Sequence, residues 1–85
     1  MKTEFEFYAP EARKVSVAGS FNDWNATKAP LKKDANGKWK LALVLSPGRY
    51  EYRYFVDGVW QNDQRTVECI PNLLGTWNCV LEVRD

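Results

Sequence analysis

The residues of this sequence with the clearest capacity for chemistry are two tryptophans, Trp24 and Trp60, which lie outside any apolar run. Trp24 is in the polar, turn-prone stretch 19–25, and Trp60 follows the turn dipeptide Asp57-Gly58. A flat, amphipathic indole ring can pack against the apolar face of a ligand while its N–H finds a polar partner. A second interpretation is that each ring folds back and caps one end of a protein core.

Polar side chains expected near these rings complete a set that could bind a polyhydroxylated ligand. Arg53 is predicted to point outward on the strand that leads toward Trp60, and Thr76 and Asn78 are predicted to point outward on the last strand. An indole can cover the C–H face of a glucose ring, while guanidinium, amide and hydroxyl groups pair with the sugar hydroxyls. Tryptophan and arginine are also enriched at protein interfaces, so the residues alone leave both kinds of ligand open.

The same sequence argues against a catalytic or metal site. It contains no histidine, which removes the commonest general base and metal ligand and rules out Ser-His-Asp and Cys-His arrangements. Acids such as Glu51, Asp57 and Asp63 are present, but a chain of 85 residues offers no deep cleft in which two carboxylates could act on a glycosidic bond. We therefore expect a protein that is not an enzyme and that needs no metal and no cofactor.

The two cysteines, Cys69 and Cys79, do not have the spacing of a metal-binding pair,. A disulfide between them is conceivable, but a reducing cytoplasm disfavours it. The sequence predicts two free thiols, at least one of them buried.

Charge and hydropathy exclude two further classes of partner. The net charge is +1, with acids and bases mixed along the chain, so the basic surface of a nucleic-acid or anionic-membrane binder is missing. No apolar run approaches the roughly 20 residues that a membrane-spanning helix needs. The first residues also lack the apolar segment of a signal peptide, so a cytoplasmic location is expected.

We expect strands to position the candidate residues, because hydrophobicity alternates with a period of two along most of the chain. We expect one domain over 1–85, an all-β, immunoglobulin-like sandwich of about seven short antiparallel strands. The predicted strands are 4–8, 14–19, 38–45, 49–56, 59–61, 65–69 and 77–83.

Strand parity and turn dipeptides refine this prediction. Trp39 and Trp77 are each in phase with the aliphatic residues of their strands, so both are assigned to the core. The dipeptides Asn36-Gly37 and Asp57-Gly58 are typical of type I′ hairpin turns, in which both central residues have positive φ.

Several motifs, in order along nearly the whole chain, resemble one known family. They are the runs Phe5–Pro10, Val15–Trp24, Tyr50–Trp60 and Pro71–Asn78. Together they are similar to carbohydrate-binding module family 48, an early-set, isoamylase N-terminal-like group. That family includes the glycogen-binding domain of the AMP-activated protein kinase β subunit and the N-terminal modules of branching and debranching enzymes.

The resemblance implies a non-catalytic module that binds α-1,4-linked glucans such as glycogen, starch or malto-oligosaccharides. Glucose rings would stack on two tryptophans, and a cationic residue between them, a lysine in the kinase-type domain, would contact hydroxyls. Carried over by position, the implied carbohydrate-binding residues are Trp24, Arg53, Trp60, Leu74, Thr76 and Asn78.

Many members of that family have lost their sugar-binding residues and only pack against a catalytic domain. Trp24 and Trp60 are both retained here, together with Arg53 and Asn78, which favours the binding type. The alternative is a protein-interaction module that docks on a catalytic domain, a kinase-type partner or another enzyme of glucan metabolism.

Overall fold

The chain is described by a computed structural model that covers residues 2–65 and 67–84. All of its regular elements are strands: β1 (Lys2–Tyr8), β2 (Val15–Gly19), β3 (Lys32–Lys33), β4 (Lys38–Val44), β5 (Gly48–Val56), β6 (Val59–Gln61), β7 (Cys69–Pro71) and β8 (Trp77–Val83). The described residues contain no helix of the length and apolar character that a membrane crossing requires.

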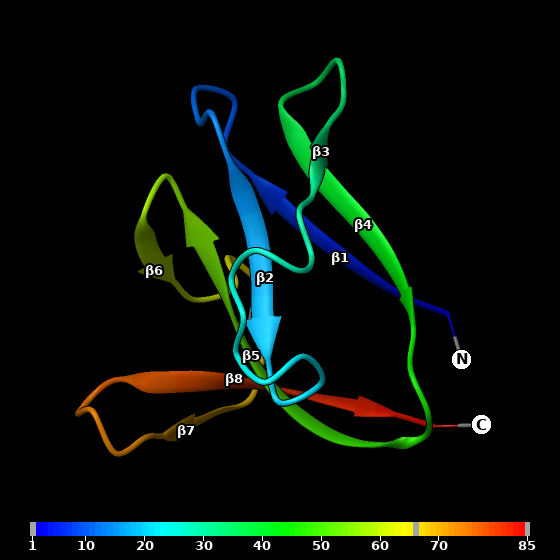
Figure 1. Cartoon of the computed structure of the whole chain (residues 1–85), viewed down its shortest axis with the longest axis vertical. Helices are drawn as coiled ribbons and strands as arrows, with labels where there is room; N and C mark the ends of the chain where they lie inside the picture. The colour runs from blue at the N-terminus through cyan, green and yellow to red at the C-terminus, as the bar shows by residue number, and fades with distance from the viewer. Residues whose placement is uncertain (1, 66, 85) are drawn as a thin grey trace.

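These strands form two antiparallel sheets that pack face to face (Figure 1). Sheet A has the order β1-β4-β3, and sheet B has the order β2-β5-β8-β7, with β6 added beside β5. The predicted all-β sandwich is confirmed, and the described residues form eight strands in place of about seven. The additional strand, Lys32–Lys33, has only two residues, which is too short to produce an alternating pattern.

One edge of β5 is shared by two strands, and this division creates the site described below. The first half of β5, from Gly48 to Tyr52, pairs with β8, whereas Tyr54 to Val56 pairs with β6. The β7–β8 hairpin therefore leaves the sheet beside the last residue of β6, Gln61, which pairs with Tyr54. It projects past the rest of the sandwich at the left of Figure 1. Side chains of β6 and of this hairpin line a hollow between them, which is called the wedge below.

Aromatic rings fill the space between the sheets. Phe5 and Phe7 of sheet A are each 2% exposed. The ring centroids of Phe5 and Tyr52 are 5.6 Å apart in an edge-to-face contact, and those of Phe7 and Tyr54 are 4.9 Å apart. Such pairs contribute about 0.5–1.5 kcal/mol each beyond the burial of their area, so the tyrosines that β5 turns inward fix sheet B against sheet A.

The parity prediction is right for one tryptophan and wrong for the other. Trp39 is 8% exposed and belongs to the core, whereas Trp77, also assigned to the core, is 54% exposed. Pairing of β8 with β5 ends at Cys79, and Trp77 pairs only with Pro71 of β7. The Trp77 ring points to the same side of β8 as the buried Cys79. At Trp77, however, the hairpin extends beyond sheet A, so no second sheet covers the ring.

One of the two predicted hairpin turns is confirmed. Asp57 and Gly58 have φ values of 48° and 84°, as a type I′ turn requires,. The Asn36-Gly37 prediction is wrong in type, because Gly37 has a positive φ of 82° and Asn36 does not. Asp34 explains the difference, since its carboxylate accepts hydrogen bonds from the Asn36 and Lys38 N–H groups at 2.8 and 3.1 Å and shapes a longer loop.

The strand predicted over residues 65–69 is shifted in the structure. Thr66 lies outside the described residues, Arg65, Val67 and Glu68 are not in a strand, and β7 begins only at Cys69. Residues 63–65 are held mainly by side-chain hydrogen bonds and not by a strand ladder.

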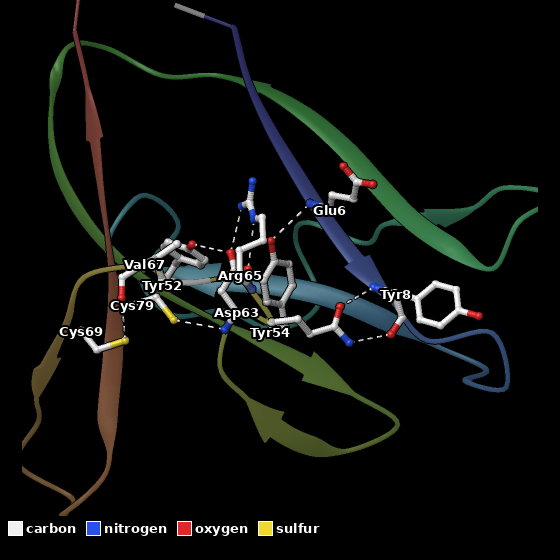
Figure 2. Close-up of polar contacts among 10 residues, drawn as sticks. Glu6, Tyr8, Tyr52, Tyr54, Asp63, Arg65, Val67, Cys69 and Cys79 are labelled. Carbon is white, nitrogen blue, oxygen red and sulfur yellow. Dashed lines mark hydrogen bonds and ion pairs between the residues drawn. The ribbon is translucent and has the colours of Figure 1, made fainter.

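Asp63 is the anchor of that segment (Figure 2). Its carboxylate, only 1% exposed, accepts hydrogen bonds from the Tyr52 hydroxyl at 2.7 Å and from the Arg65 guanidinium at 2.9 Å. Its main-chain N–H donates to the Cys79 sulfur at 3.2 Å. Burial acts to raise the pKa of Asp63, but the hydrogen bonds from Arg65 and Tyr52 outweigh it and hold that pKa below its ordinary value,.

The next residue, Gln64, joins the segment to sheet A. Its amide accepts a hydrogen bond from the Tyr8 N–H at 2.8 Å and donates one to the Tyr8 carbonyl at 2.7 Å. Two residues earlier on β1, the Glu6 N–H donates to the Tyr54 hydroxyl at 3.2 Å. At this end of β1 the Glu6 N–H and both backbone groups of Tyr8 are thus paired with side chains of sheet B and its connection (Figure 2).

Replacing Asp63 by asparagine is expected to lower the free energy of unfolding by about 2 kcal/mol at pH 7, because hydrogen bonds to a charged group contribute roughly 1.5–3 kcal/mol. The folded pKa of Asp63 is depressed, so its stabilisation is present above about pH 4 and is lost as the pH falls through the folded pKa. The difference between wild type and Asp63→Asn, measured by urea unfolding, should therefore shrink below about pH 4. The exposed Glu11 supplies the control Glu11→Gln, which should follow wild type. A difference for Asp63→Asn that is independent of pH would contradict this role.

Candidate functional site

The wedge between β6 and the β7–β8 hairpin holds a cavity of about 300 Å³ on the outer side of sheet B. Its walls come from the β2–β3 connection, β5, β6 and the hairpin. The lining residues are Trp24, Arg53, Trp60, Asn72, Leu74 and Asn78.

Trp24 is held by a tight loop at the end of β2. The Asn22 carboxamide accepts from the Gly19 N–H at 3.0 Å and donates to the Val17 carbonyl at 3.3 Å, while the Trp24 N–H donates to the Gly19 carbonyl at 2.9 Å. Asp23 and Trp24 have φ values of 55° and 59°, in a region that residues other than glycine seldom adopt. Such unfavourable geometry is typical of functional positions.

Trp60 stands on the outer face of sheet B above Phe55. The two residues are opposite each other across the β5–β6 hairpin, and their ring centroids are 4.7 Å apart. Trp24 contacts Trp60 edge to face, with 6.5 Å between the ring centroids and an angle of 69° between the ring planes. The two tryptophans are 36% and 39% exposed, and neither belongs to the core cluster of the described residues. The interpretation that they cap the core is therefore not supported.

The guanidinium of Arg53 is fixed from two sides. Its Nε donates to the Asn62 carboxamide oxygen at 2.7 Å, and its Nη1 donates to the Thr76 hydroxyl at 3.3 Å. Asn62 directly precedes Asp63, so the buried carboxylate that anchors the segment also places the partner of Arg53. The arginine thereby reaches the cavity with a defined orientation and with donors left for a ligand.

A second polar centre, Asn72, organises the hairpin loop. Its Oδ1 accepts hydrogen bonds from the Leu74 and Thr76 N–H groups at 3.0 and 3.1 Å. Its Nδ2 donates to the Asn78 Oδ1 at 2.9 Å, and the Asn78 Nδ2 donates to Glu51 at 3.0 Å. Gly75, with φ of 82°, lets the loop turn back, so that Leu74 projects beside the cavity.

Five of the six predicted site residues line the cavity, and the sixth, Thr76, contacts Arg53 from the side. Three contributors were not predicted: Asn72 on the wall, and Asn62 and Phe55 beneath it. Phe55 could have been found, because a two-residue turn at Asp57-Gly58 places it opposite Trp60. The two asparagines could not, since asparagine is common in any turn.

The site offers recognition chemistry more readily than bond-breaking chemistry. It combines two exposed indole faces with one guanidinium and two amides. Within residues 2–65 and 67–84, the site included, no three acidic or thiol side chains gather closely enough to hold a metal ion. The expectation that the chain needs no metal or cofactor stays a prediction.

Comparison with known proteins agrees with this geometry. A family described as the glycogen recognition site of AMP-activated protein kinase matches residues 1–85. The chain belongs to this family. The resemblance seen in the sequence motifs is thereby confirmed.

Relatives of this chain occur in plants and animals. Protein FLOURY ENDOSPERM 6, chloroplastic, of Oryza sativa subsp. japonica is 36% identical over 63 residues, which is 74% of this chain and 12% of that protein. Protein PTST homolog 2, chloroplastic, of Arabidopsis thaliana is 38% identical over the same share. The 5'-AMP-activated protein kinase subunit beta-2 of Homo sapiens is 38% identical over 72 residues, which is 85% of this chain and 25% of that subunit. The chain thus spans about an eighth to a quarter of the length of these relatives.

Replacing Asn72 by alanine is expected to loosen the hairpin loop of this glycogen-recognition domain, because the Leu74 and Thr76 N–H groups lose their acceptor. Protection of these two amides against hydrogen exchange should fall about fivefold or more, since a lost acceptor costs about 1 kcal/mol or more. Exchange followed by NMR would measure this change. The adjacent control Leu73→Ala, at a fully exposed side chain, should leave both amides protected. Unchanged protection in Asn72→Ala would show that the loop does not depend on this amide.

Proposed function

We propose that this chain is a non-catalytic module that binds α-1,4-linked glucans, such as glycogen, starch or malto-oligosaccharides, in the cavity between β6 and the β7–β8 hairpin. The observation that carries the proposal is the convergence of Trp24, Trp60 and Arg53 with two amide side chains on one cavity. Membership of a family of glycogen recognition sites supports the same ligand.

The angle between the tryptophans favours an α-linked chain. The two rings meet at 69°, so a ligand that stacks on both must change direction between one glucose unit and another. An α-1,4-linked glucan curves along its length and meets this requirement, whereas a straight β-1,4-linked chain can lie on only one ring. Each stacking contact removes apolar surface of the sugar and of the indole from water.

Polar groups around the rings would select hydroxyls. Arg53 donates from a planar fork already held by Asn62 and Thr76. Asn78 has a second amide hydrogen beside the one that it donates to Glu51, and Asn72 holds Asn78 in place. Because these groups are ordered before the ligand arrives, little side-chain freedom is lost on binding. The site is small and open, so short oligosaccharides bind with modest affinity and a polymer binds more strongly through its many equivalent segments.

The wider setting is also part of the proposal. Residues 1–85 act as one binding domain in the cytoplasm, where an α-glucan is the primary partner and a catalytic domain or an enzyme of glucan metabolism is a second one. A relative named as a subunit of AMP-activated protein kinase supports an association with an enzyme. Nucleic acids and membranes are not expected partners.

Titration with a linear malto-oligosaccharide tests the proposed ligand. Tryptophan fluorescence should change in a saturable way, and Trp24→Ala and Trp60→Ala should each raise Kd by about tenfold to a hundredfold, since stacking on an indole contributes roughly 1.5–3 kcal/mol. Both variants should keep the native circular dichroism spectrum because neither ring is in the core. A β-1,4-linked oligosaccharide is the control ligand. A folded wild-type protein that gives no response at millimolar α-glucan would refute the proposal.

The two adjacent leucines of the hairpin loop offer a matched test of the site. Leu74 lines the cavity, whereas Leu73 does not, and their side chains are 88% and 105% exposed. Leu74→Ala should weaken malto-oligosaccharide binding about threefold to tenfold, because contact with a bound sugar buries its apolar surface. Leu73→Ala should bind like wild type in the same isothermal titration. Equal effects of the two substitutions would show that Leu74 has no contact of its own with the glucan.

A second candidate function, docking on a protein, is favoured by one observation. Trp77 is 54% exposed on the face of β8 opposite Asn78, away from the proposed glucan cavity. Large exposed apolar side chains are enriched where proteins meet. If the folded chain fails to bind α-glucan, docking becomes the leading function, and Trp77→Ala should then abolish co-purification with a catalytic partner while Trp24→Ala leaves it unchanged.

A further inference from the structure

The register of the β7–β8 hairpin places its two cysteines directly opposite each other. Cys69 pairs with Cys79, one step from the pair Ile70–Asn78. The Val80 N–H donates to the Glu68 carbonyl at 2.8 Å, and the Asn72 N–H donates to the Thr76 carbonyl at 2.9 Å. In an antiparallel ladder hydrogen-bonded and non-hydrogen-bonded pairs alternate, so Cys69 and Cys79 form a non-hydrogen-bonded pair.

This kind of pair brings two side chains as close as a sheet allows. Opposite Cα atoms of a non-hydrogen-bonded pair are about 4.5 Å apart, and a disulfide joins Cα atoms about 4.4–6.8 Å apart. The Cβ atoms must approach slightly more than in a relaxed pair. The strand β7 can make this movement, because it is three residues long and lies at the edge of sheet B.

We propose that Cys69 and Cys79 are a thiol–disulfide pair, in which a cross-strand bond formed with a small-molecule disulfide staples the hairpin that carries one wall of the cavity. Both thiols are free in the structure, so the structure describes the reduced form. The sequence alone gave no support for this bond. The register of β7 against β8, which pairs Cys69 with Cys79, now supports it. The slight compression of the pair makes the bond easier to reduce than a relaxed structural disulfide, which suits a reversible modification.

Exposure decides the order of the two chemical steps. Cys69 is partly exposed, whereas Cys79 is fully buried, and burial raises the pKa of the Cys79 thiol to about 11. The Cys69 thiolate therefore attacks one sulfur of the small disulfide, forms a mixed disulfide and releases one small thiol. Cys79 then gives up its proton and attacks the Cys69 sulfur, and the second small thiol leaves with that proton. Two protein thiols are oxidised, and one small disulfide is reduced to two thiols.

The bond would act on the site through elements already described. The hairpin between the two cysteines contains Asn72, Leu74 and Asn78, which form one wall of the cavity. On the other side, the Cys79 sulfur accepts the N–H of Asp63, and the neighbouring Asn62 holds Arg53. A covalent staple at this point limits the motion of the wall, and it lowers the ordering that a ligand must impose.

The bond itself is tested by incubating the folded chain with oxidised glutathione, unfolding it in acidic urea, alkylating all remaining thiols and measuring the mass. The expected product is a monomer that has lost two hydrogens, carries no alkyl group and returns to the starting mass with a reducing agent. Its Tm should be higher than that of the reduced chain by roughly 10 °C or more, since the staple closes a short loop. Cys69→Ser, which keeps the buried thiol, should show neither change.

Two results would overturn the staple. One is a folded wild-type chain that still takes up two alkyl groups after incubation, and the other is a glutathione adduct that stays on Cys69 without closing onto Cys79. Both results come from the unmodified sequence, so they do not depend on whether a variant folds.

The effect on ligand binding rests on the proposed function. The oxidised chain should bind a linear malto-oligosaccharide several-fold more tightly than the reduced chain. Equal affinity of the two forms would overturn the coupling between staple and cavity. A chain that closes the bond but binds no α-glucan in either form would instead refute the proposed function and leave the staple established by its mass.

Discussion

The buried carboxylate of Asp63 is the interaction on which the arrangement of this domain most depends. It joins a core tyrosine of β5 to Arg65, and the N–H of the same residue joins the loop to β8 through the Cys79 sulfur. A buried charge is tolerated only when hydrogen bonds surround it. The carboxylate therefore requires a single course for the chain that leaves β6, and the residues on either side, Asn62 and Gln64, inherit their positions from it.

The cavity is a consequence of that fixed course and of the divided edge of β5. Asn62 orients Arg53, while Asn72 and Asn78 extend the same kind of contact along the hairpin to Glu51. The polar groups of the site are thus bonded to one another before any ligand is present. The indole rings depend on different forces, because Trp60 lies on Phe55 and Trp24 is placed by an unfavourable backbone. Rigid polar groups and supported rings together make a preformed surface.

Much of the fold could be predicted from the sequence because alternating strands reveal which face is buried. Tyr52, Tyr54 and Trp39 lie in the core as parity indicates. Parity fails for Trp77 because it assumes that a second sheet covers the whole strand, and where a strand leaves its sheet is decided by pairing between distant segments. The main members of the candidate site followed from motifs and outward parity. Asn62 and Asn72 did not, since their importance comes from partners that only folding brings near.

The contacts that Gln64 and Tyr54 make with β1 have an effect beyond holding two sheets together. A strand at the border of a sheet normally presents free N–H and C=O groups, and these invite a strand from another molecule to add on. The N–H of Glu6 and both backbone groups of Tyr8 already have side-chain partners, and the opposite border of sheet A is a strand of two lysines. This stretch of β1 is therefore less available for pairing with a strand from a second copy of the chain,.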